Sequence, residues 1–499
     1  MDTRTDLLCA ATRAFLQRPK RMLIDGQWCA AADGAVITTE DPATETTLAE
    51  VPAGGAADVE AAVQAARKAF EQGPWHAMRP SDRERLLLRL ADLVEANAEE
   101  LAQIEAMDNG KPATMARAID VAGAAGFLRY MAGWATKLHG ENLDVSVPLV
   151  REREFVAFTR QEAVGVVGAI IPWNFPLLMA AWKLGPALAC GCTVVLKPAE
   201  ETPLSALRLG ELVVEAGYPA GVVNIVTGDG ARCGAALAGH PDVDKIAFTG
   251  STEVGKLVGG MAMERLARVT LELGGKSPVI MLDDISPEAA AAGAAQAIFF
   301  NQGQVCTAGS RLYLPRARFD ATVQALADIA NSLRLGPGLE PDTGMGPLVS
   351  RRQRKRVAGY VQAGVDAGAQ LVCGGGADLP RGHFFRPTVL AQAPETSSVV
   401  QEEIFGPVVV ALPYDDIDEV VGRANGTPFG LAASVWSNDL SRVHRLVPRI
   451  KAGTVWVNCH NVLDNAMPFG GFKQSGLGRE MGRAVFDHYT ETKSVMIAV

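Results

Sequence analysis

The first part of the chain shows apolar residues at helical spacing. Residues 58–73 are rich in alanine, and a second amphipathic helix is predicted from Ser81, because Ser81-Asp82-Arg83-Glu84 has the form of a capping box. The sequence Asn109-Gly110-Lys111-Pro112 is a helix stop signal, so we predict that this helix ends there. The apolar face of the second helix carries Leu86, Leu87, Leu90, Leu93 and Val94.

From about residue 163, apolar runs of strand length alternate with helical patterns. Such alternation indicates βαβ units and therefore an α/β fold with a doubly wound parallel sheet. Ligands of these sheets bind beyond the carboxyl ends of the strands, so the turns after the strands are the places to look for chemistry. The predicted strands are 164–171, 193–196, 222–226, 245–248 and 269–273, and the predicted helices are 176–190, 203–216, 230–238 and 252–266.

A second α/β segment is predicted from residue 277 to about residue 476. The run of basic residues from Arg351 to Arg356 within it is typical of a solvated helix face. Residues 145–162 and 487–499 fit neither segment, because both have a strand-like pattern. They could pair as a flap, or they could extend a sheet in a neighbouring subunit.

Residues 163–182 form an apolar run of twenty residues in which Asn174 is the one polar side chain. This run is long enough to cross a bilayer. Pro172 and Pro176, however, bracket Asn174 and break a helix there, so we interpret the run as a buried strand, a turn and a buried helix. The N-terminus has no apolar signal core, and we predict a cytoplasmic protein without a membrane span.

The composition excludes several classes of protein. With 47 basic and 56 acidic residues the formal net charge is −9, which is wrong for a mainly electrostatic nucleic-acid binder. A hydrophobic fraction of 48% excludes global disorder. Eight cysteines do not make a disulfide scaffold in a chain of 499 residues, and without a Cys-x-x-Cys or His-Glu-x-x-His motif we predict no metal site.

Two turns that follow predicted strands resemble phosphate-binding loops. Residues 250–256 have the Walker A spacing, but Leu257 replaces the hydroxyl residue that would hold magnesium, which disfavours a nucleoside triphosphatase. Residues 228–234 have one residue more than the dinucleotide fingerprint. Each motif alone fits a plain turn equally well, but on consecutive βα turns they favour a dinucleotide.

The turn after the predicted strand 193–196 contains Glu200. A carboxylate at this position can accept hydrogen bonds from both ribose hydroxyls and would repel a 2′-phosphate, which favours NAD over NADP. The alternative interpretation is that Glu200 caps the helix that begins beside Pro203.

Three residues have the chemistry of a nucleophilic site. Cys306 lies in a polar, glycine-rich turn, whereas the other seven cysteines are better interpreted as small buried residues. A free thiol is only a few per cent thiolate at neutral pH and needs activation. Glu272 ends a buried strand, where burial would raise its pKa and suit a general base. The amide of Asn174 could donate to an oxyanion.

Taken together, these residues resemble the aldehyde dehydrogenase superfamily, and the likeness covers nearly the whole chain in the family's order. The motifs that carry it are Pro172-Trp173-Asn174-Phe175-Pro176, Lys197-Pro198-Ala199-Glu200, Phe248-Thr249-Gly250-Ser251, Leu271-Glu272-Leu273-Gly274-Gly275-Lys276, Gly303-Gln304-Val305-Cys306, Glu403-Ile404-Phe405-Gly406-Pro407 and Pro468-Phe469-Gly470-Gly471.

The resemblance implies a three-part architecture: an NAD-binding domain (residues 1–144 and 163–275), an α/β catalytic domain (276–476) and a β-flap for oligomerisation (145–162 and 487–499). It implies that Cys306 attacks the aldehyde, that Asn174 holds the oxyanion and that Glu272 activates water. Lys183 and Glu480 match positions proposed to relay protons. The implied cofactor-binding residues are Ile170, Pro172, Trp173, Lys197, Glu200, Gly230, Gly250, Ser251, Gly255, Leu273, Glu403 and Phe405.

The implied substrate is a small apolar or aryl aldehyde, because the residues that match the family's pocket are mostly apolar or aromatic and none is acidic. Residues 173–182 and 454–478 look similar to bacterial phenylacetaldehyde dehydrogenases, and the implied protein is a homodimer or homotetramer. The implied pocket residues are Phe175, Leu178, Met179, Trp182, Phe300, Val305, Thr307, Asn461, Leu463 and Phe469.

Other functions stay open at this point. An enzyme for another aliphatic or an amino or betaine-type aldehyde would share all the motifs. A coenzyme A-acylating dehydrogenase is disfavoured because Glu272 is present. A cysteine acyl-transferase would need no dinucleotide, and a non-catalytic protein would have no reason to keep the nucleophile, the base and the amide together.

Overall fold

A computed structural model describes residues 6–376 and 379–499. Its largest sheet has five parallel strands in the order β11, β10, β7, β8 and β9, extended by antiparallel strands at both edges. The order in which β7 lies between β10 and β8 is that of a doubly wound sheet, as predicted. The strands across the sheet are β19 (Gly476–Leu477), β11 (Arg268–Glu272), β10 (Lys245–Thr249), β7 (Val166–Ile170), β8 (Thr193–Lys197), β9 (Val223–Ile225), β1 (Met22–Ile24) and β2 (Gln27–Cys29).

Helices cover both faces of this sheet because successive side chains of each strand point to opposite faces. Val166 and Val195 pack in one apolar cluster, with the helices α2, α10 and α11. Val167 and Val194 pack in another cluster, with α4, α7, α8 and α9. The bounds of these helices are α2 (Ala56–Glu71), α4 (Pro80–Ala96), α7 (Ala122–Ala132), α8 (Pro176–Cys190), α9 (Leu204–Ala216), α10 (Ala235–Gly239) and α11 (Thr252–Met263).

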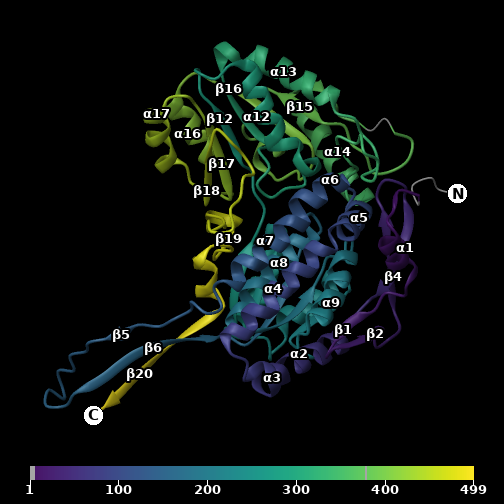
Figure 1. Cartoon of the computed structure of the whole chain (residues 1–499). Helices are drawn as coiled ribbons and strands as arrows, with labels where there is room; N and C mark the ends of the chain where they lie inside the picture. Colours follow the sequence, from purple (N-terminus) through teal and green to yellow (C-terminus); the bar gives the residue numbers. More distant parts are fainter. Residues whose placement is uncertain (1–5, 377–378) are drawn as a thin grey trace.

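A second sheet of seven strands forms the other half of the protein, with β14 antiparallel at one edge and the other strands parallel. The two halves lie in the upper and lower parts of Figure 1. Its elements are β14 (Gln370–Cys373), β15 (Thr388–Ala391), β16 (Val408–Tyr414), β13 (Arg311–Pro315), β12 (Pro278–Met281), β17 (Ala432–Trp436) and β18 (Thr454–Val457), with the helices α12 (Pro287–Phe299), α13 (Phe319–Ser332), α14 (Arg351–Asp366), α15 (Ser398–Gln401), α16 (Ile417–Asn425) and α17 (Leu440–Leu446).

The apolar core continues from one half into the other. Val279 and Leu312 of the second sheet belong to the same cluster as Val167 and Val194 of the first sheet. Both halves therefore share a packed interior, and residues carried by different sheets can be held in fixed positions relative to each other.

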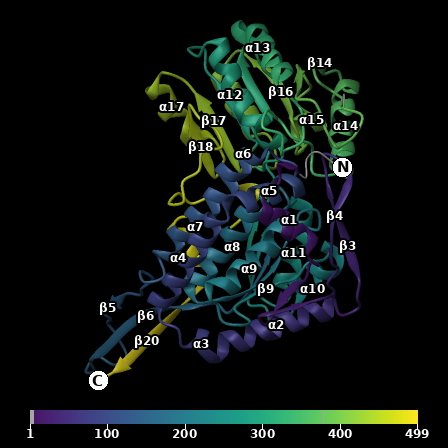
Figure 2. The ribbon, with the colours of Figure 1, turned by 45° about the vertical axis from the view of Figure 1, so that its right-hand side comes forward.

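A small third sheet projects from the body, with its strands in the order β20, β6 and β5 (Figure 1). Its strands are β5 (Asn142–Leu143), β6 (Phe155–Ala163) and β20 (Thr490–Ala498). The predicted pairing of the two strand-like segments is present, because β20 pairs antiparallel with β6 over nine residues on each strand. The C-terminus lies at the tip of this flap, which Figure 2 shows from a second direction.

The N-terminal half contains the remaining elements. The strands β3 (Val36–Asp41) and β4 (Thr46–Pro52) form a two-stranded sheet. The remaining helices there are α1 (Ala10–Gln17), α3 (Gly73–His76), α5 (Ala98–Asp108) and α6 (Ala113–Met115). The apolar run 163–182 folds as the predicted strand, turn and buried helix. No helix within residues 6–376 and 379–499 is long and apolar enough to cross a membrane.

Two predicted details were wrong. The capping box at Ser81 does not form, because Pro80 already occupies the first helical position and Arg79 is the N-cap. The helix is interrupted at Asn97, where α4 ends and α5 begins. The basic run lies on the predicted exposed helix face, in α14, where Arg352 also pairs with Glu201 of the other half at 2.7 Å.

Candidate active site

The carboxyl ends of β7, β8, β10 and β11 meet at one edge of the first sheet. Ile170 lies opposite Lys197 and Phe248, and Thr249 lies opposite Glu272. This edge therefore brings together turns from four separate βα units, as expected for a doubly wound sheet.

The turn with Cys306 follows α12. Three consecutive residues before it, Asn301, Gln302 and Gly303, have φ values of 46°, 57° and 69°. The left-handed conformation is tolerable for glycine and asparagine but costs energy for glutamine, so the surrounding structure must hold the turn. Burial, together with the carboxylates of Glu403 and Glu272, raises the pKa of the Cys306 thiol to about 12.

Asn174 lies in the turn between β7 and α8, and its side chain contacts the cysteine turn. Its Nδ2 donates to the backbone oxygen of Gln304 at 3.0 Å, two residues before Cys306. An amide nitrogen has two hydrogens, so one donor remains for another acceptor. The structure thus brings Asn174 against the turn that carries Cys306, bonded to Gln304.

Glu272 ends β11 and is 4% exposed. Neither carboxyl oxygen has a hydrogen-bond partner among the described residues. Burial raises its pKa well above the ordinary value, and the nearby Glu480 raises it further. A buried carboxyl without a partner is costly, which is a frequent sign of a functional position.

Lys183 and Glu480 form a buried ion pair, with Nζ 2.5 Å from Oε1. Lys183 comes from α8, whereas Glu480 lies in the segment after β19, so the pair joins distant parts of the chain. Both charges act on the pKa of Glu272, in opposite directions. The structure therefore groups these three predicted residues.

Three turns at the edge of the first sheet carry predicted dinucleotide-binding residues. Lys197 is almost fully buried at the end of β8, with Nζ 3.6 Å from a carboxyl oxygen of Glu200, whose side chain is 39% exposed. Ser251 is the N-cap of α11 and accepts from the N–H of Val254 at 3.3 Å. Gly255 packs so closely on Leu273 that a Cβ would lie 2.3 Å from a Leu273 methyl group.

The turn from Gly228 to Gly234 has a different local structure from the predicted helix. Residues Gly230–Gly234 form a π-helical turn (η3) before α10, and Asp229 caps it by accepting from the N–H of Arg232. Gly230 has open space where a Cβ would stand, and Gly250 packs on the Phe248 ring.

Glu403 links the second half of the protein to this edge. Its Oε1 accepts from the backbone N–H of Gly275 at 3.0 Å, and burial raises its pKa to about 7. Phe405, two residues on, meets the Trp173 ring edge-to-face at 5.1 Å. Pro172 and Trp173 precede Asn174, so the cofactor candidates of both halves border the cysteine site.

Most of the predicted substrate residues gather in one apolar cluster that contains paired aromatic rings. Phe175 stacks on Phe300 at 6.0 Å, and Trp182 meets Phe469 at 5.4 Å. Thr307 donates to the Asn461 side chain at 2.7 Å. Leu178, Met179 and Val305 are buried in the same cluster against which Cys306 packs, whereas Leu463 is 45% exposed and lies outside it.

Sequence reasoning missed several residues of the site. Gly275 is one of them, because a Cβ there would lie 2.3 Å from the backbone oxygen of Cys306. His460 is another, since its Nε2 donates to the backbone oxygen of Thr307 at 2.8 Å. Gly275 lies in one of the family motifs, but nothing in the sequence assigned it a role. His460 lies in no motif, and no hydrophobic periodicity distinguishes it.

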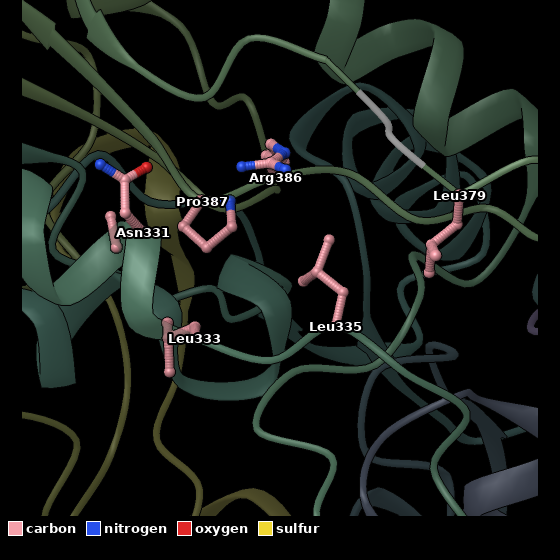
Figure 3. Close-up of a pocket in the computed structure, with 7 residues that line it drawn as sticks. Asn331, Leu333, Leu335, Leu379, Arg386 and Pro387 are labelled. Carbon is pink, nitrogen blue, oxygen red and sulfur yellow. The ribbon is translucent and has the colours of Figure 1, made fainter.

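A cavity of about 160 Å³ lies elsewhere, at the end of α13 (Figure 3). None of the residues that line it is a predicted site residue, so we do not assign it to the active site. The residues that line it are Ala330, Asn331, Leu333, Leu335, Leu379, Arg386 and Pro387.

The fold and the site define an α/β enzyme with a half-buried cysteine beside a dinucleotide-type sheet edge. The profile of the Aldehyde dehydrogenase family matches residues 28–495. The chain belongs to the aldehyde dehydrogenase family, which confirms the predicted family, fold and enzyme class.

Relatives and solved structures match over nearly the full length. The chain is 53% identical to phenylacetaldehyde dehydrogenase of Pseudomonas fluorescens, over 97% of each chain. It is 48% identical to the mitochondrial aldehyde dehydrogenase of Mesocricetus auratus, over 96% of this chain and 95% of the relative. The NAD+ complex of an aldehyde dehydrogenase from Bacillus cereus has a TM-score of 0.96 at 48% identity, over 99% of each chain.

Proposed function

We propose that this chain oxidises an apolar or aryl aldehyde of the phenylacetaldehyde type to the carboxylic acid, with NAD as cofactor. The observation that carries the proposal is the position of Cys306. It packs against the apolar cluster to which Phe175 and Phe469 belong, in a turn that also contacts Asn174.

The residues at the sheet edge fit NAD. The first turn of α11 offers free N–H groups and the positive end of the helix dipole to a pyrophosphate. Glu200 is exposed enough to accept hydrogen bonds from ribose hydroxyls, and the buried Lys197 holds it in place. Glu403 would serve the second ribose. When bound there, NAD+ would supply an acceptor for the hydride of the thiohemiacetal that Cys306 forms, and loss of this hydride would leave a thioester on Cys306.

Cys306 would attack the aldehyde carbon as the thiolate and form a thiohemiacetal. The second N–H of Asn174 and the backbone N–H of Cys306 would stabilise the oxyanion. Removing one such donor costs on the order of 3–4 kcal/mol of transition-state stabilisation. Because burial raises the pKa of Cys306 to about 12, the thiol proton must leave during or before the attack.

Glu272 would take a proton from the water that hydrolyses the thioester. Its raised pKa makes the carboxylate a strong base once it is ionised. The Lys183–Glu480 pair lies close enough to Glu272 to affect its pKa, and it would carry the proton onward. Hydrolysis, rather than transfer to coenzyme A, follows from the presence of this base.

The substrate class follows from the pocket wall. Three aromatic pairs lie among the predicted substrate and cofactor residues, and aromatic faces favour apolar and aryl groups. None of the ten predicted pocket residues is acidic, which gives a quaternary ammonium group no carboxylate partner. The relative from Pseudomonas fluorescens, named as a phenylacetaldehyde dehydrogenase, supports the same class.

The flap supports a further proposal, that the chain assembles into a dimer or tetramer. β20 is an edge strand, and Met496 and Ile497 on it are 56% and 47% exposed. An exposed edge with apolar side chains is a surface that a second copy would cover.

A panel of aliphatic, aryl and amino aldehydes, ranked by kcat/KM from the rate of NADH formation, tests the proposed substrate. We expect phenylacetaldehyde to rank above betaine aldehyde, and the reverse ranking would refute the substrate assignment. Cys306→Ser should abolish NADH formation with every aldehyde. Glu272→Gln should leave one burst of NADH and then stall, whereas equal loss of burst and steady state would place Glu272 in an earlier step.

A further inference from the structure

Lys111 is a fully buried lysine in the turn after α5, and the sequence assigned it no role beyond the helix stop signal. Its Nζ donates to the Asp120 carboxylate at 2.7 Å and to the backbone oxygen of Asn174 at 2.8 Å. The same ammonium lies over the ring of Phe175, 4.3 Å from its centroid. Lys111 thus contacts two consecutive residues of the β7–α8 turn.

Two buried acids accompany the ammonium. Asp120 is its direct partner, and a carboxyl oxygen of Glu105 lies 3.9 Å from Nζ. Burial raises the pKa of both acids. A buried cluster of charges is weak evidence for stability. The free energy needed to remove the charges from water offsets much of the free energy gained from their attraction. The contacts of Lys111 support a different effect, which is to fix the position of the neighbouring backbone.

The contacts hold one short segment from several directions. Asn109 Nδ2 donates to the backbone oxygen of Trp173 at 2.8 Å. Glu105 Oε1 accepts from the N–H of Leu177 at 3.1 Å. Together with Lys111, these residues of α5 and its C-terminal turn fix the backbone on both sides of Asn174.

The backbone oxygen of Asn174 is also the place where this cluster meets the cysteine turn. It accepts a second hydrogen bond from Asn301 Nδ2 at 3.0 Å, while the Asn174 side chain bonds to Gln304. The turn that carries Lys111 packs closely on the Gly338 backbone, because a Cβ on Gly338 would lie 2.2 Å from the backbone oxygen of Lys111. The N–H of Ala113, two residues after Lys111, also donates to the backbone oxygen of Gly338 at 2.8 Å.

We propose that Lys111 is a positioning residue, which holds Asn174 at the distance and angle from which its amide serves the oxyanion. The inference rests on the proposed role of Asn174. A displacement of about 1 Å at a reacting centre can cost on the order of 10²-fold in rate, so one anchoring ammonium can matter for kcat without touching the substrate.

A double-mutant cycle tests this role. Lys111→Met keeps an apolar stem of similar length and removes the donor, and it should lower kcat by roughly 10- to 100-fold while the KM for NAD stays within about twofold. Asn174→Ala should lower kcat by roughly 10²- to 10³-fold. If Lys111 acts through Asn174, adding Lys111→Met to Asn174→Ala should cause almost no further loss.

The matched control is Lys20→Met, since Lys20 is also buried and also donates to backbone carbonyls, but at the end of α1. It should leave kcat unchanged. If Lys111→Met does not fold, Asp120→Asn weakens the hold on the ammonium while keeping an acceptor, and its smaller loss of kcat must also vanish in the Asn174→Ala background.

The outcomes separate the two proposals. Equal losses from Lys111→Met in both backgrounds, or an unchanged kcat, would overturn the positioning role alone. An Asn174→Ala variant with an undiminished kcat would instead overturn the proposed oxyanion role of Asn174.

Discussion

Gly275→Ala should impair catalysis by moving the nucleophile turn. The φ of Gly275 lies outside the left-handed region, so the backbone tolerates alanine there, but the new Cβ would lie 2.3 Å from the backbone oxygen of Cys306 and 3.3 Å from the Leu431 Cβ. Since ordinary contacts begin near 3.4 Å, the Cys306 carbonyl or the Gly275 backbone must move by about 1 Å. We expect kcat to fall on the order of 10²-fold, equivalent to about 2.7 kcal/mol of activation free energy.

The assay is the steady-state rate of NADH formation with saturating aldehyde, together with a thermal unfolding curve. Overpacking of this kind destabilises by about 1–3 kcal/mol, so the protein should still be folded at the assay temperature. Gly359→Ala in α14 is the matched control, because its Cβ would meet nothing within 4 Å, and it should leave kcat unchanged. A folded Gly275→Ala variant with the kcat of the parent would refute the steric reasoning.

Three further predictions concern the cofactor edge, the thiol and the flap. Glu200→Ser should shift the ratio of kcat/KM for NAD to that for NADP by about tenfold or more toward NADP, whereas Glu215→Ser on the exposed side of α9 should not change it. Without NAD, alkylation of Cys306 by iodoacetamide, followed by mass spectrometry, should rise about tenfold per pH unit well beyond pH 9, because its pKa is raised to about 12. A plateau near pH 8 would show an ordinary thiol. Removal of residues 494–499 should lower the mass of the assembly measured by light scattering, and an unchanged mass would contradict the proposed role of the flap.

The fold was predictable where local pattern and tertiary structure agree. Strands of a parallel sheet are buried on both faces and read as continuous apolar runs, so the run at Val166 and the run at Thr193 could be placed within a few residues. The short antiparallel strand β19 was not predicted, because two residues carry no pattern. The capping box failed because Pro80 gives the helix its start without a side-chain cap.

The candidate site was predictable only for residues whose chemistry stands out from their surroundings. Asn174 was found as the polar exception in an apolar run, and Cys306 was found as the cysteine in a polar turn. Lys111 looked like part of a stop signal, since the contacts that define it come from Asp120 and from a backbone oxygen 63 residues away. A contact between residues so far apart leaves no pattern among the neighbouring residues of a single sequence.

The pKa shifts of the two reactive groups at the site have the same direction and the same main cause. Burial raises the pKa of the Cys306 thiol to about 12 and raises the pKa of Glu272 well above its ordinary value, so both shifts favour the protonated forms. Burial is the largest cause in both cases, so the same low-polarity surroundings that strengthen an oxyanion donor also disfavour the charged forms of the nucleophile and the base. A positive charge brought within about 4–6 Å lowers the pKa of an acid by roughly 1–3 units. A cationic ligand beside Cys306 would therefore do more than occupy the site, because it would change which of these groups can react.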